Sequence, residues 1–300
     1  MPETSAARLG VGDTAPALHL TDTAGAPVAV DPGQHAATVV VFTSNGCPYA
    51  LAWHDRIQDV ARDYADRGVA VVQVVSNDAQ LQPLDSLAAM AEREGRGEVT
   101  GLFLRDESQA AARAFGATGT PELFVLDPAG VVRYHGAPDS DWDDPTLRAE
   151  WLREALDAVL DGRTPERAST PPAGCAVKWR VELLWWVGCP SHDRAEELLT
   201  DTLKTMGRED VRVQRVEITT LAQAAGRSFP GSPTFQVGGA DLFPQPDPTP
   251  ALACRTYSLD DGRVGPLPAA LQLELSLRGA LVRPWELPGW VDFRKQTASS

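Results

Sequence analysis

Hydrophobic residues first gather without interruption at positions 39–42, where three valines and a phenylalanine follow one another. An unbroken run of this kind, rich in β-branched residues, is typical of a strand buried on both faces. The turn 43–46 follows, and apolar residues then recur at helical spacing from Trp53 to Tyr64. This spacing predicts an amphipathic helix. The sequence therefore predicts a strand, a short turn and a helix in succession within the first half of the chain.

The segments on either side of this element predict an α/β domain. Residues 10–25 alternate apolar and polar positions and end in a glycine turn, which indicates a short hairpin. A second buried strand at 69–76 follows the helix, and this strand–helix–strand order makes the sheet parallel here. The remaining predicted elements are helices at 85–94, 108–115 and 147–160 and strands at 101–104, 122–126 and 131–135. The whole order is that of a thioredoxin fold with insertions.

The second half of the chain repeats the first in miniature. In both halves a Cys-Pro turn follows the first core strand, and a small residue followed by proline precedes a later strand. Such self-similarity indicates an internal duplication. We therefore predict two tandem thioredoxin-like folds, each a central mixed sheet flanked by helices. The elements predicted in the second half are strands at 179–187, 211–218 and 234–237 and helices near 195–203, 221–226 and 266–281.

The predicted domain boundaries follow from a proline-rich stretch, TPERASTPPA, that begins at Thr164. Polar, proline-rich segments behave as linkers between domains. We accordingly place the first domain at 1–163 and a linker that carries Cys175 at 164–178. The second domain is placed at 179–281 and a C-terminal tail at 282–300.

Composition narrows the classes of function. Three hundred residues, 43% of them hydrophobic and 23% charged, suffice for two domains with cores of their own. A net charge of −14 without a basic run repels phosphate backbones and anionic lipids, so we expect no nucleic acid partner. No segment approaches the roughly 18 apolar residues of a membrane helix, and the N-terminus lacks a basic and apolar leader. We therefore expect a cytoplasmic protein that has no membrane partner and no cofactor.

Four cysteines in a cytosolic chain of this size are too few for a disulfide scaffold, which favours a chemical use for them. Cys47 follows the turn 43–46 and precedes Pro48, a residue suited to the first helical position. At a helix N-terminus, unpaired N–H groups and the positive end of the helix dipole favour thiolate over thiol. Cys47 is therefore the leading reactive cysteine, and the alternative is a buried structural cysteine at the end of a strand.

Three motifs lie within residues 10–178. They are G-D-x-A-P-x-L-x-L-x-D-x-x-G from Gly12 to Gly25, N-G-C-P-Y at 45–49 and G-C-A-V-K-W at 174–179. Together they resemble a peroxiredoxin-like branch of the alkyl hydroperoxide reductase and thiol-specific antioxidant superfamily. The resemblance implies a reactive Cys47 and a cis proline at Pro121 that faces its sulfur. The alternative for Pro121 is an ordinary proline at the entry of a strand.

The chain departs from the pattern of this superfamily. Dithiol proteins of the thioredoxin type carry Cys-x-x-Cys, whereas alanine stands three residues after Cys47. Peroxiredoxins carry a proline and a threonine upstream of the cysteine. Val40 occupies the proline position, and Ser44, next to Thr43, is the residue that would supply the hydroxyl. Cys175 is then the candidate resolving thiol, and the alternative is an exposed cysteine in a linker.

Three stretches of the second half carry another resemblance: LLWWVGCPSH at 183–192, GSPTFQVGGADLF at 231–243 and LACRTY at 252–257. They are similar to small thioredoxin-like proteins grouped with alkylmercury lyases. The lyase site uses two distant cysteines and an acid three residues after the first. Cys189 and Cys254 fit the cysteines loosely, and His192 stands at the acid position. His192 either stabilises a thiolate, relays a proton or joins Cys189 on a metal, or it is a polar residue facing solvent.

The leading hypothesis is a thiol-dependent oxidoreductase in which Cys47 attacks a peroxide or disulfide and is resolved by Cys175 or an external thiol reductant. One alternative is the handling of mercury, organomercurials or other soft cations by Cys189 and Cys254. Another is a binding module without catalysis. The oligomeric state is left open, a homodimer included. The candidate catalytic residues are Cys47, Cys175 and Cys189, and the candidate supporting residues are Thr43, Ser44, Pro121, His192, Pro233 and Cys254.

Overall fold

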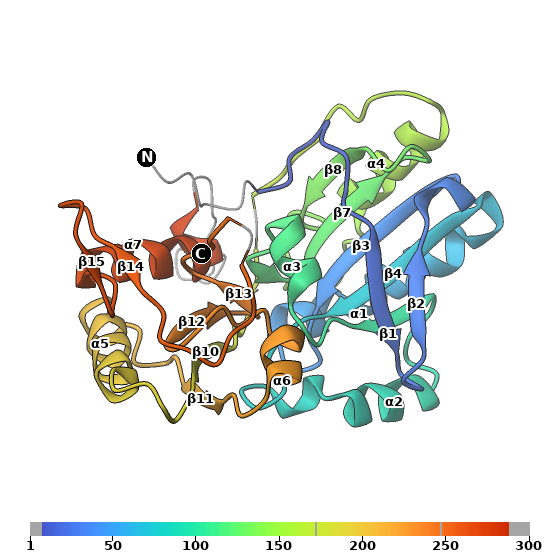
Figure 1. Ribbon diagram of the computed structural model, residues 1–300. Helices are drawn as coiled ribbons and strands as arrows, with labels where there is room; N and C mark the ends of the chain where they lie inside the picture. Colours follow the sequence, from blue (N-terminus) through green and yellow to red (C-terminus); the bar gives the residue numbers. More distant parts are fainter. Residues whose placement is uncertain (1–7, 172, 247, 288–300) are drawn as a thin grey trace. The chain divides into compact units, whose positions relative to one another are not determined.

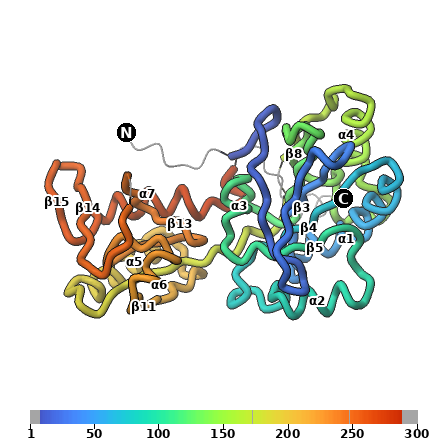
Figure 2. The backbone as a smooth tube through the Cα atoms, turned by 45° about the vertical axis from the view of Figure 1, so that its right-hand side comes forward, coloured from blue at the N-terminus to red at the C-terminus, as the bar shows by residue number. Residues whose placement is uncertain are grey.

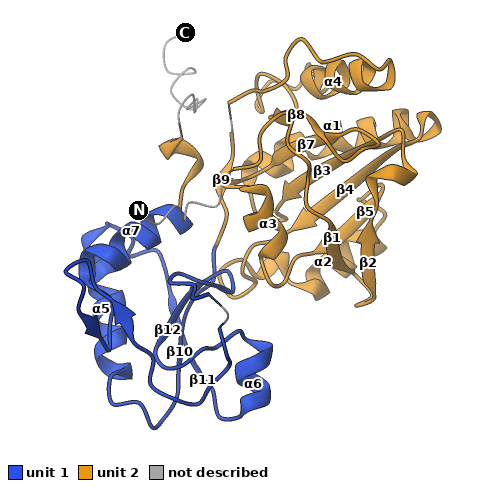
Figure 3. Cartoon of the chain, turned by 45° about the horizontal axis from the view of Figure 1, so that its top comes forward, with its two compact units in different colours: residues 1–6, 179–281 blue, residues 7–178, 282–300 orange. Residues whose placement is uncertain are grey.

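The computed structural model describes residues 8–171, 173–246 and 248–287. These residues form two compact units (Figure 3). Of the described residues, those up to Lys178 and the segment that begins at Val282 form what we call the first unit, drawn in orange in Figure 3. Trp179–Leu281 form what we call the second unit, drawn in blue. Each unit has helices around a sheet of its own, so the predicted α/β class is confirmed. Among the helices described, none is long and apolar enough to cross a membrane.

The first unit is built on a seven-stranded mixed sheet with the order β2-β1-β5-β4-β3-β7-β8 (Figures 1 and 2). β3 pairs in parallel with β4 and antiparallel with β7, and every residue of β3 is buried. The continuous apolar run of the sequence is thus the central strand of the sheet. The strands are β1 (Leu18–Asp22), β2 (Pro27–Val30), β3 (Ala37–Thr43), β4 (Val69–Val75), β5 (Leu102–Arg105), β7 (Glu122–Leu126) and β8 (Val132–Gly136).

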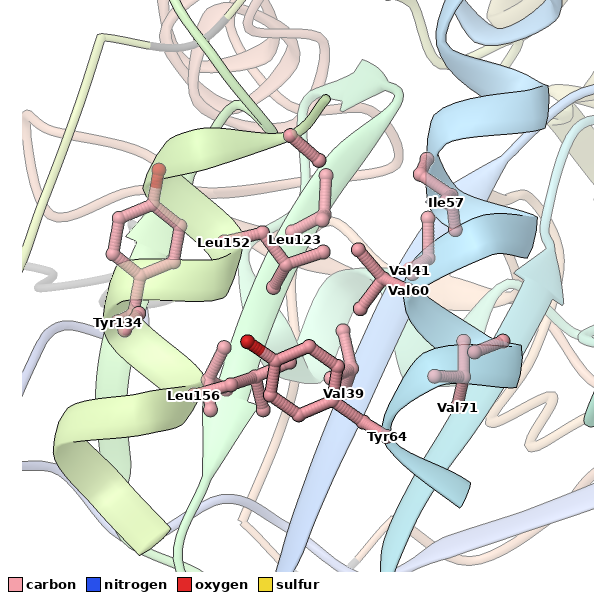
Figure 4. Packing of buried hydrophobic residues seen from close by; sticks show 14 of the residues in the cluster. Val39, Val41, Ile57, Val60, Tyr64, Val71, Leu123, Tyr134, Leu152 and Leu156 are labelled. Atoms are coloured by element: carbon pink, nitrogen blue, oxygen red, sulfur yellow. The ribbon is translucent and has the colours of Figure 1, made fainter. Parts of the chain in front are cut away.

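Helices pack against both faces of this sheet. On one face, Val39 of β3 belongs to a core that also contains residues of α1 and α4 (Figure 4). On the other face, the ring centroid of Phe42 lies 5.3 Å from that of Phe115 in α3. Because side chains alternate along a strand, β3 supplies both cores. The helices are α1 (Pro48–Asp63), α2 (Leu87–Gly95), α3 (Ala110–Phe115) and α4 (Glu150–Leu160).

The segment 164–178, predicted as a linker, packs on the first unit. The backbone N–H of Thr170 donates to the carbonyl oxygen of His135 over 3.0 Å. Further along, β9 (Cys175–Ala176) pairs antiparallel with β6 (Gly119–Thr120). A proline-rich composition argues against a helix, but it leaves carbonyl and N–H groups free to pair with a strand. The segment is therefore not a free connection between the units.

The predicted tail begins with a short 3-10 turn, η4 (Pro284–Glu286), that belongs to the first unit. The side chain of Pro284 is buried and comes within 2.9 Å of the point where a Cβ atom on Gly119 would stand. A larger residue at position 119 would therefore push against this turn. The rest of the predicted tail, 288–300, lies outside the described residues.

The second unit has a four-stranded sheet with the order β11-β10-β12-β13. β10 pairs in parallel with β11 and antiparallel with β12, which repeats the relation of β3 to β4 and β7. The unit therefore has the strand order and directions of β4-β3-β7-β8. Its elements are β10 (Val181–Trp185), α5 (His192–Thr205), β11 (Val213–Glu217), α6 (Leu221–Gly226), β12 (Thr234–Val237), β13 (Ala240–Asp241), β14 (Tyr257–Ser258), β15 (Val264–Gly265) and α7 (Ala270–Ala280).

Candidate functional site: two cysteine pairs

Cys47 lies where β3 has ended and α1 begins. It is the N-cap residue of α1, and Pro48 is the first helical residue, as the sequence predicts. The backbone N–H of Ala50, in the first turn, is a hydrogen-bond donor to the ionised sulfur. Only 2% of Cys47 is exposed. The thiol is thus buried at the positive end of a helix dipole, where a negative charge is favoured.

The cis peptide bond between Thr120 and Pro121 lies beside this sulfur. The Cys47 thiol donates a hydrogen bond to the carbonyl oxygen of Thr120 over 2.9 Å. The hydroxyl of Thr120 is buried and finds no hydrogen-bond partner among the described residues. A buried hydroxyl without a partner is costly, and an ionised sulfur beside it is an acceptor that it can serve. Thr120 therefore offers its carbonyl oxygen as an acceptor to the neutral Cys47 thiol and its hydroxyl as a donor to the thiolate.

Cys175 is brought to the same place by strand pairing. In the β6–β9 ladder, Cys175 stands opposite Thr120, the residue that accepts from Cys47. The Cys175 side chain is half-buried, and its thiol lies within hydrogen-bonding reach of the Cys47 sulfur. The structure therefore brings the predicted reactive cysteine and the predicted resolving cysteine together, although they are far apart in the sequence.

The pKa of Cys47 is lowered from its ordinary value of 9.0 to about 6. The largest cause is the hydrogen bond from the Cys175 side chain. Burial acts in the opposite direction, because it favours the neutral thiol. The side chain of Thr120 and the N–H groups of Ala50 and Cys175 add smaller stabilisation of the thiolate. Cys47 is therefore a thiolate near neutral pH.

Ser44 and Thr43 precede Cys47 but do not act on its sulfur directly. The hydroxyl of Ser44 donates to a buried carboxylate oxygen of Asp85 over 2.7 Å, which differs from the expected role beside the sulfur. The same carboxylate accepts from the N–H of Asn45 over 2.6 Å. Thr43 is the buried last residue of β3. These contacts fix the turn that delivers Cys47 to the helix.

Asn77 links the two segments that carry Cys47 and Cys175. Its side-chain nitrogen donates to Asp85 over 2.7 Å, and its side-chain oxygen accepts from the N–H of Lys178 over 2.7 Å. One buried amide thereby holds both the turn before Cys47 and the chain just after Cys175. The sequence analysis missed Asn77 and Asp85. Their only local signal is their place after a buried strand and near a predicted helix start.

Glu122, the residue after the cis proline, was also missed. Its carboxylate accepts from the N–H groups of Thr118 (2.9 Å) and Gly119 (3.1 Å), so it fixes the loop that carries Thr120. Burial alone would raise the pKa of Glu122, but the hydrogen bond from His135 and the charge of Arg8 outweigh it and lower the pKa to about 2. A fully buried carboxylate is tolerated here because it is paired and hydrogen-bonded.

The second unit holds a similar pair. Cys189, 2% exposed, donates to the carbonyl oxygen of Ser232 over 3.3 Å, and the Ser232–Pro233 peptide bond is cis. Ser232 in turn forms an isolated β-bridge with Cys254, which is exposed. The pKa of Cys254 is raised by burial of its immediate surroundings and by the charge and hydrogen bond of Cys189. The thiols of Cys189 and Cys254 therefore lie next to each other.

His192 is not aimed at the Cys189 sulfur. Its Nδ1 bonds to the carbonyl oxygen of Cys189 over 2.6 Å, so Nδ1 carries the hydrogen. Its Nε2 lies 3.3 Å from a carboxylate oxygen of Asp193, and its ring stacks on Trp185. Both ring nitrogens thus have other partners. α5 begins at His192, so Cys189 stands ahead of the first turn and not at its cap as Cys47 does.

Neither pair extends into a larger metal site. Within the described residues, no group of three or more histidine, cysteine or acidic side chains is arranged to hold a metal ion. A cation at either pair would therefore have two thiolates as its protein ligands, an arrangement suited to soft cations.

Comparisons with known proteins found one family and several solved structures that are similar to part of this chain. The sequence profile of the Redoxin family matches residues 10–150. A hypothetical protein from Sinorhizobium meliloti 1021 is 33% identical over 57% of this chain and 94% of its own, with a TM-score of 0.53. An uncharacterized conserved protein from Geobacillus kaustophilus is 32% identical over 58% of this chain and 94% of its own, with a TM-score of 0.54. A search of the curated proteins found no match.

The matched region has the features just described in one unit. It contains the central strand β3, the Cys47 turn and the cis Thr120–Pro121 bond. The matches to the two solved structures, at over 30% identity, cover 94% of the length of each. Through the unit that contains residues 10–150, the chain belongs to the Redoxin family.

Proposed function

We propose that the first unit is a thiol oxidoreductase in which Cys47 reduces a peroxide or a disulfide and Cys175 resolves the oxidised Cys47. The observation that carries this proposal is the contact of the two thiols beside the cis Thr120–Pro121 bond. A neighbouring thiol that donates to the reactive sulfur is also the group best placed to attack it after oxidation. A cytosolic setting, which the sequence predicts, would keep the pair reduced between turnovers.

The first half-reaction needs an ionised sulfur. The Cys47 thiolate attacks one oxygen of a hydroperoxide, so an S–O bond forms and the O–O bond breaks. The second oxygen leaves with a proton as an alcohol or water, and Cys47 becomes a sulfenic acid. With a disulfide substrate, the thiolate instead displaces one sulfur and forms a mixed disulfide.

The second half-reaction uses Cys175. Its sulfur, after loss of its proton, attacks the sulfur of the oxidised Cys47 and forms the Cys47–Cys175 disulfide, and water or the second substrate thiol leaves. Two protein thiols have then supplied two electrons to the substrate. An external thiol reductant restores both thiols by exchange and closes the cycle.

Burial favours the smaller of the two substrate classes. Cys47 is 2% exposed, so a small hydroperoxide reaches its sulfur with less displacement of neighbouring side chains than a bulky disulfide does. The absence of a second cysteine three residues after Cys47 removes the local dithiol of a thioredoxin-type reductase. Peroxide reduction is therefore the first activity to test.

The test is a stoichiometric peroxide pulse in the presence of dimedone, followed by mass spectrometry of all four cysteines. The parent should form a Cys47–Cys175 disulfide. Cys175→Ser should retain the first half-reaction and accumulate dimedone-labelled Cys47, whereas Cys47→Ser should consume no peroxide. Cys254→Ser, in the other unit, is the matched control and should form the Cys47–Cys175 disulfide as the parent does. An equal loss of the first half-reaction in Cys175→Ser would refute the resolving role.

A second candidate function, the binding of a soft cation by the second unit, is favoured by the contact between the Cys189 and Cys254 thiols. Two adjacent thiolates bind such a cation far better than one. In a reduced full-length Cys47→Ser/Cys175→Ser background, we expect one tightly bound mercuric ion per chain. Cys189→Ser or Cys254→Ser should each remove most of that affinity, and binding unchanged in both variants would exclude this function.

His192→Gln is the matched control for the cation measurement. Because both ring nitrogens of His192 are already engaged by the Cys189 carbonyl and Asp193, its loss should leave the mercuric affinity close to that of the parent. A large loss would instead make His192 a ligand, as one reading of the sequence suggests.

A further inference from the structure

The two units carry the same arrangement of sulfur and backbone. In each, a cysteine follows an inner strand of the sheet, β3 or β10. Its thiol donates a hydrogen bond to the carbonyl oxygen of the residue before a cis proline, and that residue pairs with a second cysteine. The distances from sulfur to oxygen are 2.9 Å in the first unit and 3.3 Å in the second. The corresponding residues are Cys47, Thr120 and Cys175 in the first unit and Cys189, Ser232 and Cys254 in the second.

The segment that carries Cys254 is held on both sides of the cysteine. The N–H of Ser232 donates to the carbonyl oxygen of Ala253, and the N–H of Arg255 donates to the carbonyl oxygen of Ser232, each over 2.8 Å. Gly231 allows this approach, because a Cβ atom there would come within 3.0 Å of the Ala253 oxygen. The proline-rich loop before Cys254 therefore ends in a fixed position beside Ser232.

Arg255 secures the same segment from its other side. Its guanidinium is buried, forms an ion pair with Asp241 at 2.8 Å and donates to the hydroxyl of Thr234 over 3.1 Å. Its charge also lies over the ring of Tyr257. The hydrogen bonds of its backbone and the contacts of its side chain thus hold Arg255 in place. Cys254, the residue before it, therefore stays next to Cys189 although no disulfide joins the two.

The two thiols of this pair differ in access. Cys189 is 2% exposed, whereas Cys254 is an exposed residue. We propose that Cys189 and Cys254 form a second dithiol–disulfide centre, which exchanges with external low-molecular-weight thiols and disulfides through the sulfur of Cys254. This centre is independent of the function proposed for the first unit, since none of its residues belongs to that unit.

Reduction of the centre proceeds in two exchanges. An external thiolate attacks the Cys254 sulfur, so a mixed disulfide forms on Cys254, the bond to Cys189 breaks and Cys189 leaves as a thiolate that takes up a proton. A second external thiolate attacks the external sulfur of the mixed disulfide and releases Cys254. The external thiols become one disulfide, and their two electrons reside on the two cysteines. Oxidation by an external disulfide is the reverse sequence.

The difference in access supports this direction of attack. Cys254 is exposed and Cys189 is buried, so an external thiolate reaches the Cys254 sulfur first. Breakage of the disulfide should therefore release Cys189 inward and leave the external group on Cys254.

The test uses the full-length Cys47→Ser/Cys175→Ser protein in glutathione buffers of increasing disulfide content, with acid quenching, alkylation and mass spectrometry. We expect a single intramolecular Cys189–Cys254 disulfide that appears in a two-electron transition. With Cys189→Ser added, glutathione should accumulate on Cys254. With Cys254→Ser added, Cys189 should stay unmodified, since it is buried.

Two outcomes would overturn the proposal. One is the absence of a Cys189–Cys254 disulfide at every buffer ratio in a chain whose circular dichroism and thermal unfolding match the parent. The other is glutathionylation of Cys189 in the Cys254→Ser variant as fast as that of Cys254 in the Cys189→Ser variant. The Cys189→Ser/Cys254→Ser protein, titrated in parallel, reports the Cys47–Cys175 pair alone, so failure of one centre is not confused with failure of the other.

Discussion

The substitution Cys175→Ala removes the interaction that most lowers the pKa of Cys47. That interaction is the hydrogen bond from the Cys175 side chain to the Cys47 sulfur. The smaller contributions from Thr120 and from the N–H of Ala50 remain, and so does burial, which favours the neutral thiol. The pKa of Cys47 should therefore rise from about 6 toward its ordinary value of 9.0.

The size of the effect depends strongly on what is measured. At pH 7 a thiol with a pKa of about 6 is roughly 90% thiolate, whereas one with a pKa of about 9 is roughly 1% thiolate. The thiolate of the more acidic thiol is intrinsically less nucleophilic, by roughly 15- to 30-fold over three pKa units at a Brønsted slope of about 0.4–0.5. The two factors nearly cancel. The reaction rate at pH 7 should change only about 3- to 6-fold if the whole shift is lost.

The midpoint of ionisation is therefore the decisive measurement. In a Cys189→Ser/Cys254→Ser background, ultraviolet absorbance of the thiolate against pH reports the first pair alone. The midpoint should rise in Cys175→Ala and rise less in Cys175→Ser, which keeps a hydroxyl donor at the same position. A Cys175→Ala variant that ionises at the same pH as its parent would show that the thiol contact does not control Cys47.

Three further predictions concern the framework of the first unit, each measured by urea unfolding. The pKa of Glu122 is below its ordinary value of 4.5, so its ionised form stabilises the fold above that pH and the stabilisation is lost as pH falls toward about 2. Glu122→Gln should remove this fall in the free energy of unfolding at low pH, which is worth up to roughly 3 kcal/mol. An equally steep fall in the variant would show that Glu122 is not its cause. Asp85→Ala leaves two donors of the Cys47 turn and the side-chain amide of Asn77 unpaired and should cost roughly 2–4 kcal/mol, so a variant as stable as the parent would disprove its anchoring role. Leu152→Ala, at a fully buried position of α4, should cost roughly 2–5 kcal/mol, and a loss well below this range would mean that the site collapses around the smaller residue.

The bounds of some elements were predicted from the sequence, and those of others were not. Glu122–Leu126 and Thr234–Val237 have the predicted bounds, because buried strands are continuous apolar runs between turn residues. The predicted helix at 147–160 begins instead at Glu150. Its N-cap, Ala149, has no capping side chain and is held by a hydrogen bond from its N–H to Asp139, a contact that no local pattern reveals.

Two residues of the candidate site, Cys47 and Pro121, were predictable for a similar reason. A cysteine before proline at the end of a buried strand is a local motif, and so is a Thr-Pro at the start of another strand. No local motif predicts where Cys175 lies, because the β6–β9 ladder brings it to Thr120 from a segment whose composition is that of a linker. Glu122 did carry a signal that went unused. A charged residue inside an otherwise apolar strand must be paired when the strand is buried, and such a residue beside a predicted cis proline merits a search for its partners.

The repeated arrangement of thiols rests on different supports in the two units. In the first, the residue after the cis proline is Glu122, whose carboxylate binds two N–H groups of the preceding loop. In the second, the corresponding residue is Thr234, whose hydroxyl donates to the carbonyl of Gly231 over 2.6 Å and accepts from Arg255. One loop is thus held by a buried anion and the other by a neutral hydroxyl next to a cation. Because nearby charge shifts the balance between thiol and thiolate, the two cysteine pairs should differ in reduction potential even where their geometry agrees.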